Sequence, residues 1–154
     1  MIAPDQLAEF KLFAGLTPAD RLIVSELARE VAFPAGIRMF EENDPASGCW
    51  LILSGRVALE NHVPGRGSVV VQTLEGGDVL GWSWVMPPRR WHLSASVMEH
   101  TNTIELDTDR LLQLAERDPV FGYRLLLGMF EVVLNRLQST QARLLRLYRS
   151  PREP

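Results

Sequence analysis

The period at which apolar residues recur changes twice along the chain. In residues 1–30 the spacing is helical, and it predicts a short amphipathic helix over residues 5–13 that carries Leu7, Phe10 and Phe13 on one face. Thr17 followed by Pro18 is typical of a helix start, because threonine caps free backbone N–H groups and proline fits the first helical position. We therefore predict an N-terminal helical segment over residues 1–30, with its second helix running to about residue 30.

From residue 31 to residue 107 the apolar positions alternate, and glycine or proline interrupts them every few residues. This pattern is typical of short antiparallel strands. About seven or eight strands result, the number expected of a double-sheet jelly roll. We predict a mostly β fold with flanking helices, in which a double-stranded β-helix of about eight strands fills residues 31–107. The predicted breaks are Pro34–Gly36, Asn43–Pro45, Ser54-Gly55, Pro64–Gly67, Glu75–Asp78 and Glu99–Thr101.

Residues 108–148 return to the helical period. Thr108–Arg117 predicts one short helix, and Asp118-Pro119 predicts the start of a long one that continues to Tyr148. Apolar residues at alternating spacings of three and four form a heptad seam in the long helix. The seam extends past what a domain of this size can cover, and this predicts a homodimer. The alternative is that the apolar stripe packs on the β-sandwich of its own chain, which fits residues 120–127. We expect residues 149–154 to be a frayed tail. The predicted dimer residues are Phe130, Val133, Leu137, Leu144 and Leu147.

Composition narrows the class of protein. With 154 residues, 46% hydrophobic and 23% charged, the chain suits one soluble globular domain, and its net charge of −3 favours neither nucleic acid nor an anionic membrane as partner. No apolar run approaches the ~18 residues of a membrane span, and the N-terminus has no secretory pattern, so we expect a cytoplasmic protein. Cys49 is the only cysteine, which excludes an internal disulfide, and we expect it to be a buried thiol.

The sequence contains no catalytic motif that we can identify. It has no Gly-x-Ser-x-Gly, His-Glu-x-x-His, Cys-x-x-Cys or phosphate-loop pattern. The three histidines, His62, His92 and His100, stand apart and form no His-x-His pair of the kind that holds a metal in jelly-roll enzymes. We predict that the chain is not an enzyme and binds no metal.

Residues 74–97 are the stretch with the clearest binding chemistry. Gly76, Gly77 and Gly81 predict tight turns, and residues 81–86 are long enough for one helical turn before Pro87 and Pro88 stop it. The free N–H groups of such a short helix, together with arginines 89 and 90, favour an anion. The alternative is that the glycines only shape a turn and the arginines are solvated.

Four motifs in one order resemble the cyclic nucleotide-binding domain, the sensor module of catabolite-activator-type regulators, kinase regulatory subunits and gated channels. The resemblance covers roughly residues 7–148, and its most specific parts are Ser54-Gly55-Arg56-Val57 and the Gly-Gly-Asp turn at residues 76–78. It implies a jelly roll and a nucleotide-like ligand held by a phosphate-binding cassette, here residues 74–97, which we call the cassette segment. The motifs are Phe33–Gly36, Phe40–Ala46, Leu51–Val57 and Leu74–Gly81.

The cassette segment departs from the family pattern, which reads Phe-Gly-Glu and later Pro-Arg-Ala. Leu80-Gly81 matches Phe-Gly, but Trp82 replaces the glutamate that accepts the ribose hydroxyl, and tryptophan is a donor only. The residue that corresponds to the family's cassette arginine depends on how the two sequences are aligned. If Pro88 is aligned with the family's proline, the arginine is Arg89. If residues 95–98 are aligned with the following strand, the position is Trp91, next to Arg90.

Two functions from different classes remain open. In the first, the chain is a sensor that binds a cyclic nucleotide or another small anion through the Gly81, Trp82 and Ser83 amides, Arg89 or Arg90, and stacking on Trp82, Trp84 or Trp91. In the second, the tryptophans fill the pocket and the chain is a dimerisation or protein-interaction module.

Regulators of the family carry a DNA-binding domain after the long helix. This chain ends at Pro154, so we expect no such domain. We expect the output to pass through an unidentified protein partner or through the dimer.

Overall fold

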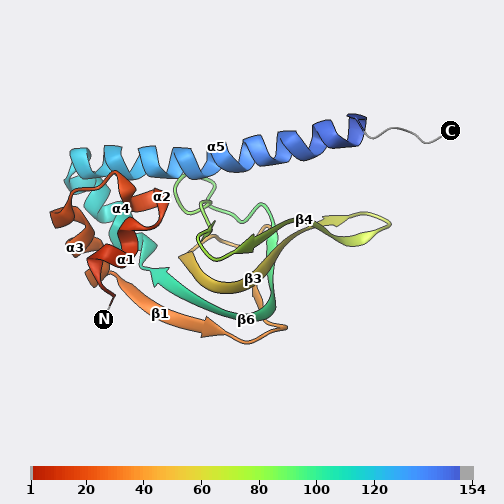
Figure 1. Ribbon diagram of the computed structural model, residues 1–154, viewed down its shortest axis with the longest axis horizontal. Coiled ribbons are helices and arrows are strands. Elements are labelled where there is room, and N and C mark those ends of the chain that lie inside the picture. Colours follow the sequence, from red (N-terminus) through yellow and green to blue (C-terminus); the bar gives the residue numbers. More distant parts are fainter. Residues whose placement is uncertain (1, 150–154) are drawn as a thin grey trace.

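The structure is a computed structural model that describes residues 2–149. An antiparallel β-roll carries a group of helices at one end, and one long helix lies across both (Figure 1). The helices are α1 (Pro4–Ala8), α2 (Lys11–Ala14), α3 (Pro18–Glu26), α4 (Thr108–Arg117) and α5 (Pro119–Arg149). The strands are β1 (Ala28–Phe33), β2 (Arg38–Phe40), β3 (Cys49–Val63), β4 (Gly67–Glu75), β5 (Val79–Leu80) and β6 (Ser94–Leu106).

Side-chain caps set the starts of the helices α3, α4 and α5. The Thr17 hydroxyl accepts the Asp20 N–H at 3.1 Å, and Asp107 accepts the Arg110 N–H at 3.2 Å. Asp118 accepts the Phe121 N–H at 3.2 Å. Each cap satisfies a backbone donor that the helix itself leaves free. The three predicted helix starts are confirmed.

The N-terminal segment differs from the prediction in two places. Residues 5–13 form two short helices, because Phe10 adopts an extended backbone (φ −94°, ψ 132°) between them. The second predicted helix ends at Glu26, since residues 28–33 pair along their whole length with residues 101–106 of β6. Strand pairing across the sheet thus overrides the helical pattern of residues 27–30.

The predicted antiparallel roll is confirmed, with six strands where the sequence predicted about seven or eight. Its sheet runs β1-β6-β3-β4, with β2 paired to β6 and β5 paired to β3. Ser54-Gly55 and Glu99–Thr101 were predicted breaks, but they lie inside β3 and β6, where the register shifts. At Gly55 (φ +105°) a Cβ would collide with Thr101, so glycine lets the strand bend without ending. Two long bent strands therefore replace four short ones.

Apolar side chains form two clusters. The helical core joins the N-terminal helices to α4 and α5 through Leu7, Phe13, Leu111 and Phe121. Cys49 belongs to this core and is fully buried, and burial raises the pKa of its thiol to about 12. The roll core fills the space between the strands. Its members are Trp50, Ile52, Val57, Leu59, Leu74, Leu80, Trp91 and Ala95.

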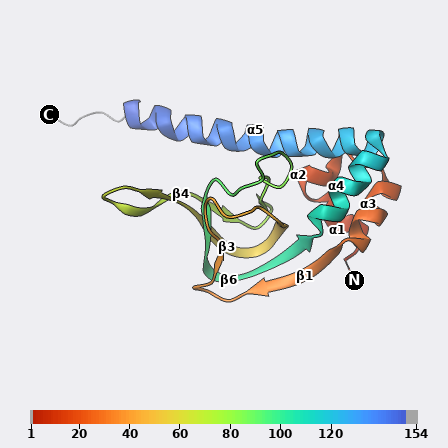
Figure 2. The same ribbon diagram turned by 180° about the vertical axis from the view of Figure 1, so that it is seen from behind.

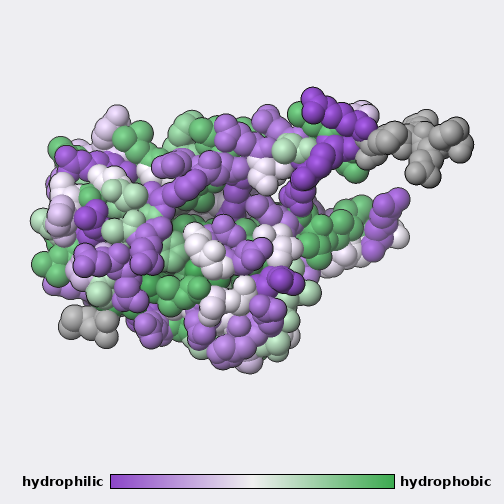
Figure 3. Space-filling view, viewed as in Figure 1, coloured by the Kyte–Doolittle hydropathy of each residue, from purple (hydrophilic) through white to green (hydrophobic). Residues whose placement is uncertain are grey.

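Helix α5 has 31 residues, and only its first half is anchored on the body. The last turns extend past the roll beside the β4 hairpin (Figures 1 and 2). Figure 3 shows a notch between the end of the helix and this hairpin, so the last turns have a free surface. No helix within residues 2–149 has both the length and the hydropathy of a membrane span.

We expect Gly128→Ala to destabilise the protein. In an open helix this change would stabilise by about 1 kcal/mol through helix propensity. Here the new Cβ would overlap the Leu12 carbonyl of α2, and forcing apart two packed helices costs about 1–3 kcal/mol. Urea unfolding should show a net loss of stability. The control is Gly15→Ala, where nothing lies within 4 Å of the added Cβ, and we expect no loss beyond about 0.5 kcal/mol. Equal effects at the two glycines would contradict this account.

Candidate functional site

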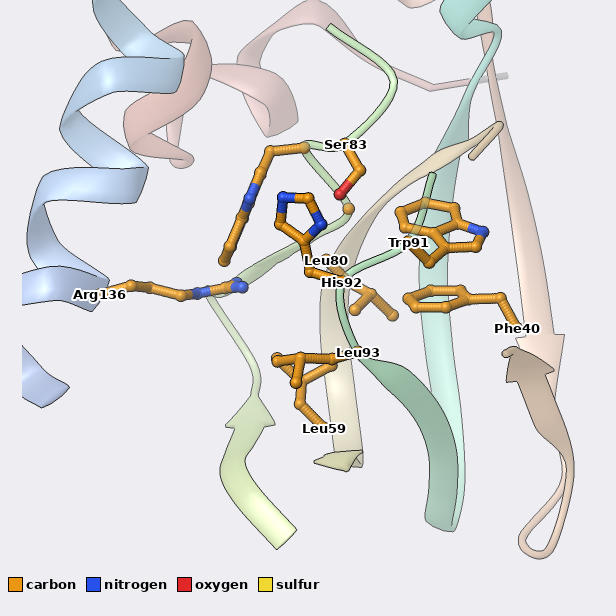
Figure 4. Close-up of a pocket in the computed structure, with 10 residues that line it drawn as sticks. Phe40, Leu59, Leu80, Ser83, Trp91, His92, Leu93 and Arg136 are labelled. Atoms are coloured by element: carbon orange, nitrogen blue, oxygen red, sulfur yellow. The ribbon is translucent and has the colours of Figure 1, made fainter. Parts of the chain in front are cut away.

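A small cavity lies between the cassette segment, the roll and α5, and we call it the inner cavity. It has a volume of about 30 Å³. Figure 4 shows its walls, with Phe40 and Trp91 on one side and Arg136, reaching from α5, on the other. The lining residues are Phe40, Leu59, Leu80, Gly81, Trp82, Ser83, Trp91, His92, Leu93 and Arg136.

Aromatic rings occupy most of the space inside this part of the roll. The rings of Phe40 and Trp91 stack with centroids 3.8 Å apart and an angle of 13°, and Trp50 lies 6.2 Å from Trp91. Trp91 is buried in the roll core. Ligand pockets usually measure about 300–1,000 Å³, so the inner cavity in this conformation admits water but no nucleotide.

The start of the cassette segment presents free backbone donors. The predicted helical turn at residues 81–86 is absent; a turn forms instead, with the Val85 N–H donating to the Trp82 carbonyl at 3.2 Å. The N–H groups of Gly81, Trp82 and Ser83 donate to no acceptor among residues 2–149. Gly81, at φ +97°, is buried. These three donors are suited to an anion, although no helix N-terminus supports them.

Trp84 takes no part in the inner cavity. Its side chain is buried in the helical core, and its Nε1–H donates to the Gly81 carbonyl at 2.9 Å. This bond fixes the turn that carries the three free donors. The structure therefore places Trp84 behind the site, where no ligand can stack on it.

Arginines 89 and 90 lie outside the inner cavity. Both open onto a second depression of about 710 Å³ between the cassette segment and α5, which we call the outer groove. The Arg90 guanidinium donates to the Asn43 carbonyl at 2.7 Å, and Arg89 is exposed with φ +53°. The α5 wall of the groove is Tyr123, Leu126, Leu127, Met129, Phe130 and Val133. Both arginines therefore line the same groove as Phe130 and Val133, the first two residues of the heptad seam.

Arg136 is a site residue that the sequence analysis missed. Its guanidinium lies 4.3 Å from the centre of the Trp82 ring and donates to the Val79 carbonyl. Burial lowers the pKa of Arg136 to about 10, with the Asp78 carboxylate opposing the shift, so the group stays charged at neutral pH. It is the only charged side chain among the residues that line the inner cavity.

A signal for Arg136 was present in the sequence. The buried residues Leu125, Met129 and Val132 follow one another at spacings of four and three, and four more residues lead to Arg136. The face of α5 that packs on the body therefore continues to this arginine. The prediction from sequence was based on the apolar heptad, which lies on a neighbouring face of the helix, and it did not extend the buried stripe to a charged residue.

A model of the cyclic nucleotide-binding domain family matches residues 30–118, more than half of the chain. The chain belongs to the cyclic nucleotide-binding domain family. Domains of this family are regulatory and bind cyclic nucleotides such as cyclic AMP. Within residues 2–149 of this member, no group of three His, Cys, Asp or Glu side chains is placed to hold a metal ion.

Individual relatives of this cyclic nucleotide-binding domain are distant. The CRP-like cAMP-activated global transcriptional regulator of Mycobacterium tuberculosis is 24% identical over 134 residues, which are 87% of this chain and 58% of the regulator. A candidate cyclic nucleotide-binding protein of Geobacter metallireducens GS-15 has a TM-score of 0.80 at 27% identity, covering 89% of this chain and 99% of that one. The regulatory domain of Toxoplasma gondii PKA, solved with cAMP, has a TM-score of 0.71 at 14% identity, covering 84% of this chain and 48% of that one.

We expect Trp91→Ala to lower the free energy of unfolding by about 3–5 kcal/mol, the usual cost of removing a large aromatic side chain from a packed core. Trp91 is 5% exposed and stacks on Phe40, so the truncation leaves a void. Urea unfolding measures the loss. The control is Met86→Ala in the same segment, where the side chain is 72% exposed and we expect a change within about 0.5 kcal/mol. A loss below about 1 kcal/mol at Trp91 would show that the stack adds little to the core.

Proposed function

We propose that this domain is a regulatory sensor that binds a small, nucleotide-like anion at the start of the cassette segment and signals through α5. The observation that carries the proposal is the position of Arg136. This residue belongs to the long helix, yet its guanidinium forms a wall of the inner cavity and rests on Trp82. A ligand that enters the cavity must displace this contact, and the displacement acts directly on α5.

The lining residues support an anion with an apolar, planar part. Three neighbouring N–H groups and one guanidinium offer hydrogen bonds to a phosphate or carboxylate. Trp82 offers a ring face to a base, and Trp91 would offer one only after leaving its stack with Phe40. Because the cavity is about 30 Å³, binding requires that the walls separate, and a domain that opens only with its ligand is suited to signalling.

The stack of Phe40 and Trp91 favours a second candidate function. The aromatic rings fill the roll as a core would, and a domain with a permanently filled pocket would act as a dimerisation or protein-interaction module. Titration calorimetry with cyclic AMP, cyclic GMP, 5′-AMP and uncharged adenosine separates the two functions. Saturable binding heat with at least one of the phosphate compounds supports the sensor function. The absence of binding heat with every one of them supports the interaction module.

We propose in addition that α5 joins two copies of the chain. The five seam residues are all exposed, from 38% at Val133 to 77% at Leu147. A monomer would leave this stripe in water along most of the helix, whereas a second α5 would cover it by knobs-into-holes packing. The dimer would place two inner cavities on opposite sides of one helix pair, so a signal in one copy would reach the other.

We expect light scattering to give twice the monomer mass of 17.4 kDa at micromolar concentration. The variant Leu137→Glu with Leu144→Glu should be monomeric, because the two carboxylates would be buried in the seam. The matched control adds the same charges at exposed positions off the seam, Gln138→Glu with Ala142→Glu, and should remain dimeric. A monomeric parent protein, or equal behaviour of the two double variants, contradicts the proposed dimer.

We expect cyclic AMP to bind far more weakly than the family's usual tight binding, because Trp82 offers no acceptor to the ribose hydroxyl. A lost hydrogen bond of this kind costs about 1–3 kcal/mol, or roughly one to two decades in affinity. Trp82→Glu should restore that affinity in a calorimetric titration. Trp82→Leu, which removes the indole without adding an acceptor, is the control and should not. Nanomolar binding by the parent protein would contradict the expectation.

A further inference from the structure

The inner cavity is lined by the Arg136 cation, which has no carboxylate at ion-pair distance among residues 2–149, although Asp78 is close enough to oppose the lowering of its pKa by burial. The nearby Asp78 carboxylate accepts the Glu75 N–H at 2.9 Å. A guanidinium has five N–H donors, and burying one without an anion is costly. The contacts that Arg136 does make, one carbonyl and one ring face, use only part of this capacity.

The arginines expected from the family pattern do not reach this cavity. The Arg90 guanidinium donates to the Asn43 carbonyl, and Arg89 is exposed. Neither contributes to the wall of the inner cavity, whereas Arg136 does, next to Gly81 and Ser83. Figure 4 shows the Arg136 side chain extended from α5 toward the part of the cavity where Leu80 and His92 lie.

We propose that Arg136 is the anion-binding side chain of the inner cavity, and that Trp82 holds it in place until a ligand phosphate or carboxylate takes it. This inference rests on the sensor function proposed above. The anion joins the guanidinium to the free Gly81, Trp82 and Ser83 donors, so one charge bridges the cassette segment and α5. Trp82 thus has a role in the place of the family's glutamate, because its ring face holds the Arg136 cation.

The position of Arg136 on α5 connects this exchange to the free surface of the helix. Arg136 follows the seam residue Val133 by three positions and precedes Leu137 by one. Residues of one helical turn move together. A change in the Arg136 contacts therefore shifts the part of α5 where the seam leaves the body of the domain.

The experiment compares variants in calorimetric titrations with cyclic AMP, 5′-AMP and uncharged adenosine. Arg136→Met keeps a long apolar side chain against Trp82 and removes the charge. Arg136→Lys keeps the charge but removes the paired N–H donors of the guanidinium. Arg143→Met is the matched control, because it makes the same charge change two turns later on α5. The double variant Arg89→Ala, Arg90→Ala tests the competing arginines. Circular dichroism and thermal melts verify that each variant is folded.

We expect Arg136→Met to weaken the binding of the two phosphate probes by about 10- to 100-fold, the effect of losing a charge-assisted hydrogen bond. Arg136→Lys should retain part of the affinity, and the other variants should bind as the parent does. If the parent binds and Arg136→Met binds equally well, the role of Arg136 is wrong while the sensor function stands. If the parent binds neither these two probes nor the cyclic GMP of the titrations above, both the sensor function and the role of Arg136 are wrong. If Arg136→Met does not fold, the test uses Arg136→Lys instead. The proposal is wrong if Arg136→Lys binds the phosphate probes as tightly as the parent does while the Arg89→Ala, Arg90→Ala variant binds them more weakly.

Discussion

The close packing of α5 on the N-terminal helices determines where the rest of this helix can reach. Gly128 has no side chain, and this lets the helix backbone come against the Leu12 carbonyl of α2. Val132 and Arg136 follow at spacings of four, which places them on the same face of α5. Arg136 lies about 12 Å along the axis from Gly128, at the cassette segment. The contact between α5 and α2 thus positions a cation at the cassette segment, beside the roll.

The chemistry of the site follows from the replacement of polar side chains by aromatic ones. In the sequence pattern Trp82 takes the place of the family's glutamate, and Trp91 takes that of its arginine in one of the two alignments. Stacked rings fill the roll and leave a cavity of about 30 Å³, while the Gly81 turn keeps its free N–H groups. The site is therefore closed in this conformation, but its backbone donors and the half-buried Arg136 cation are suited to an anion. This combination favours a sensor whose ligand opens the site.

The two candidate functions share the same output element. Helix α5 lines the inner cavity with Arg136, lines the outer groove with Phe130 and Val133, and carries the exposed seam beyond the body. A ligand in the cavity and a partner chain on the seam would both contact this helix, so the binding free energy of either one would depend on the position of α5. A single element that contacts all three surfaces is what coupling between them requires.

The sequence by itself determined the helix starts at Thr17 and Asp118, the long C-terminal helix and the family to which the chain belongs. The helix features depend on residues a few positions apart, and the family depends on the order of four motifs along the chain, so the sequence alone reveals them. Tertiary structure decided that β3 and β6 bend without breaking, that Trp84 faces the core, and that Arg136 enters the cavity. These outcomes depend on contacts between residues about 45 to 57 positions apart, such as Arg56 with Thr101 and Val79 with Arg136, and a local pattern carries no information on which distant side chains meet.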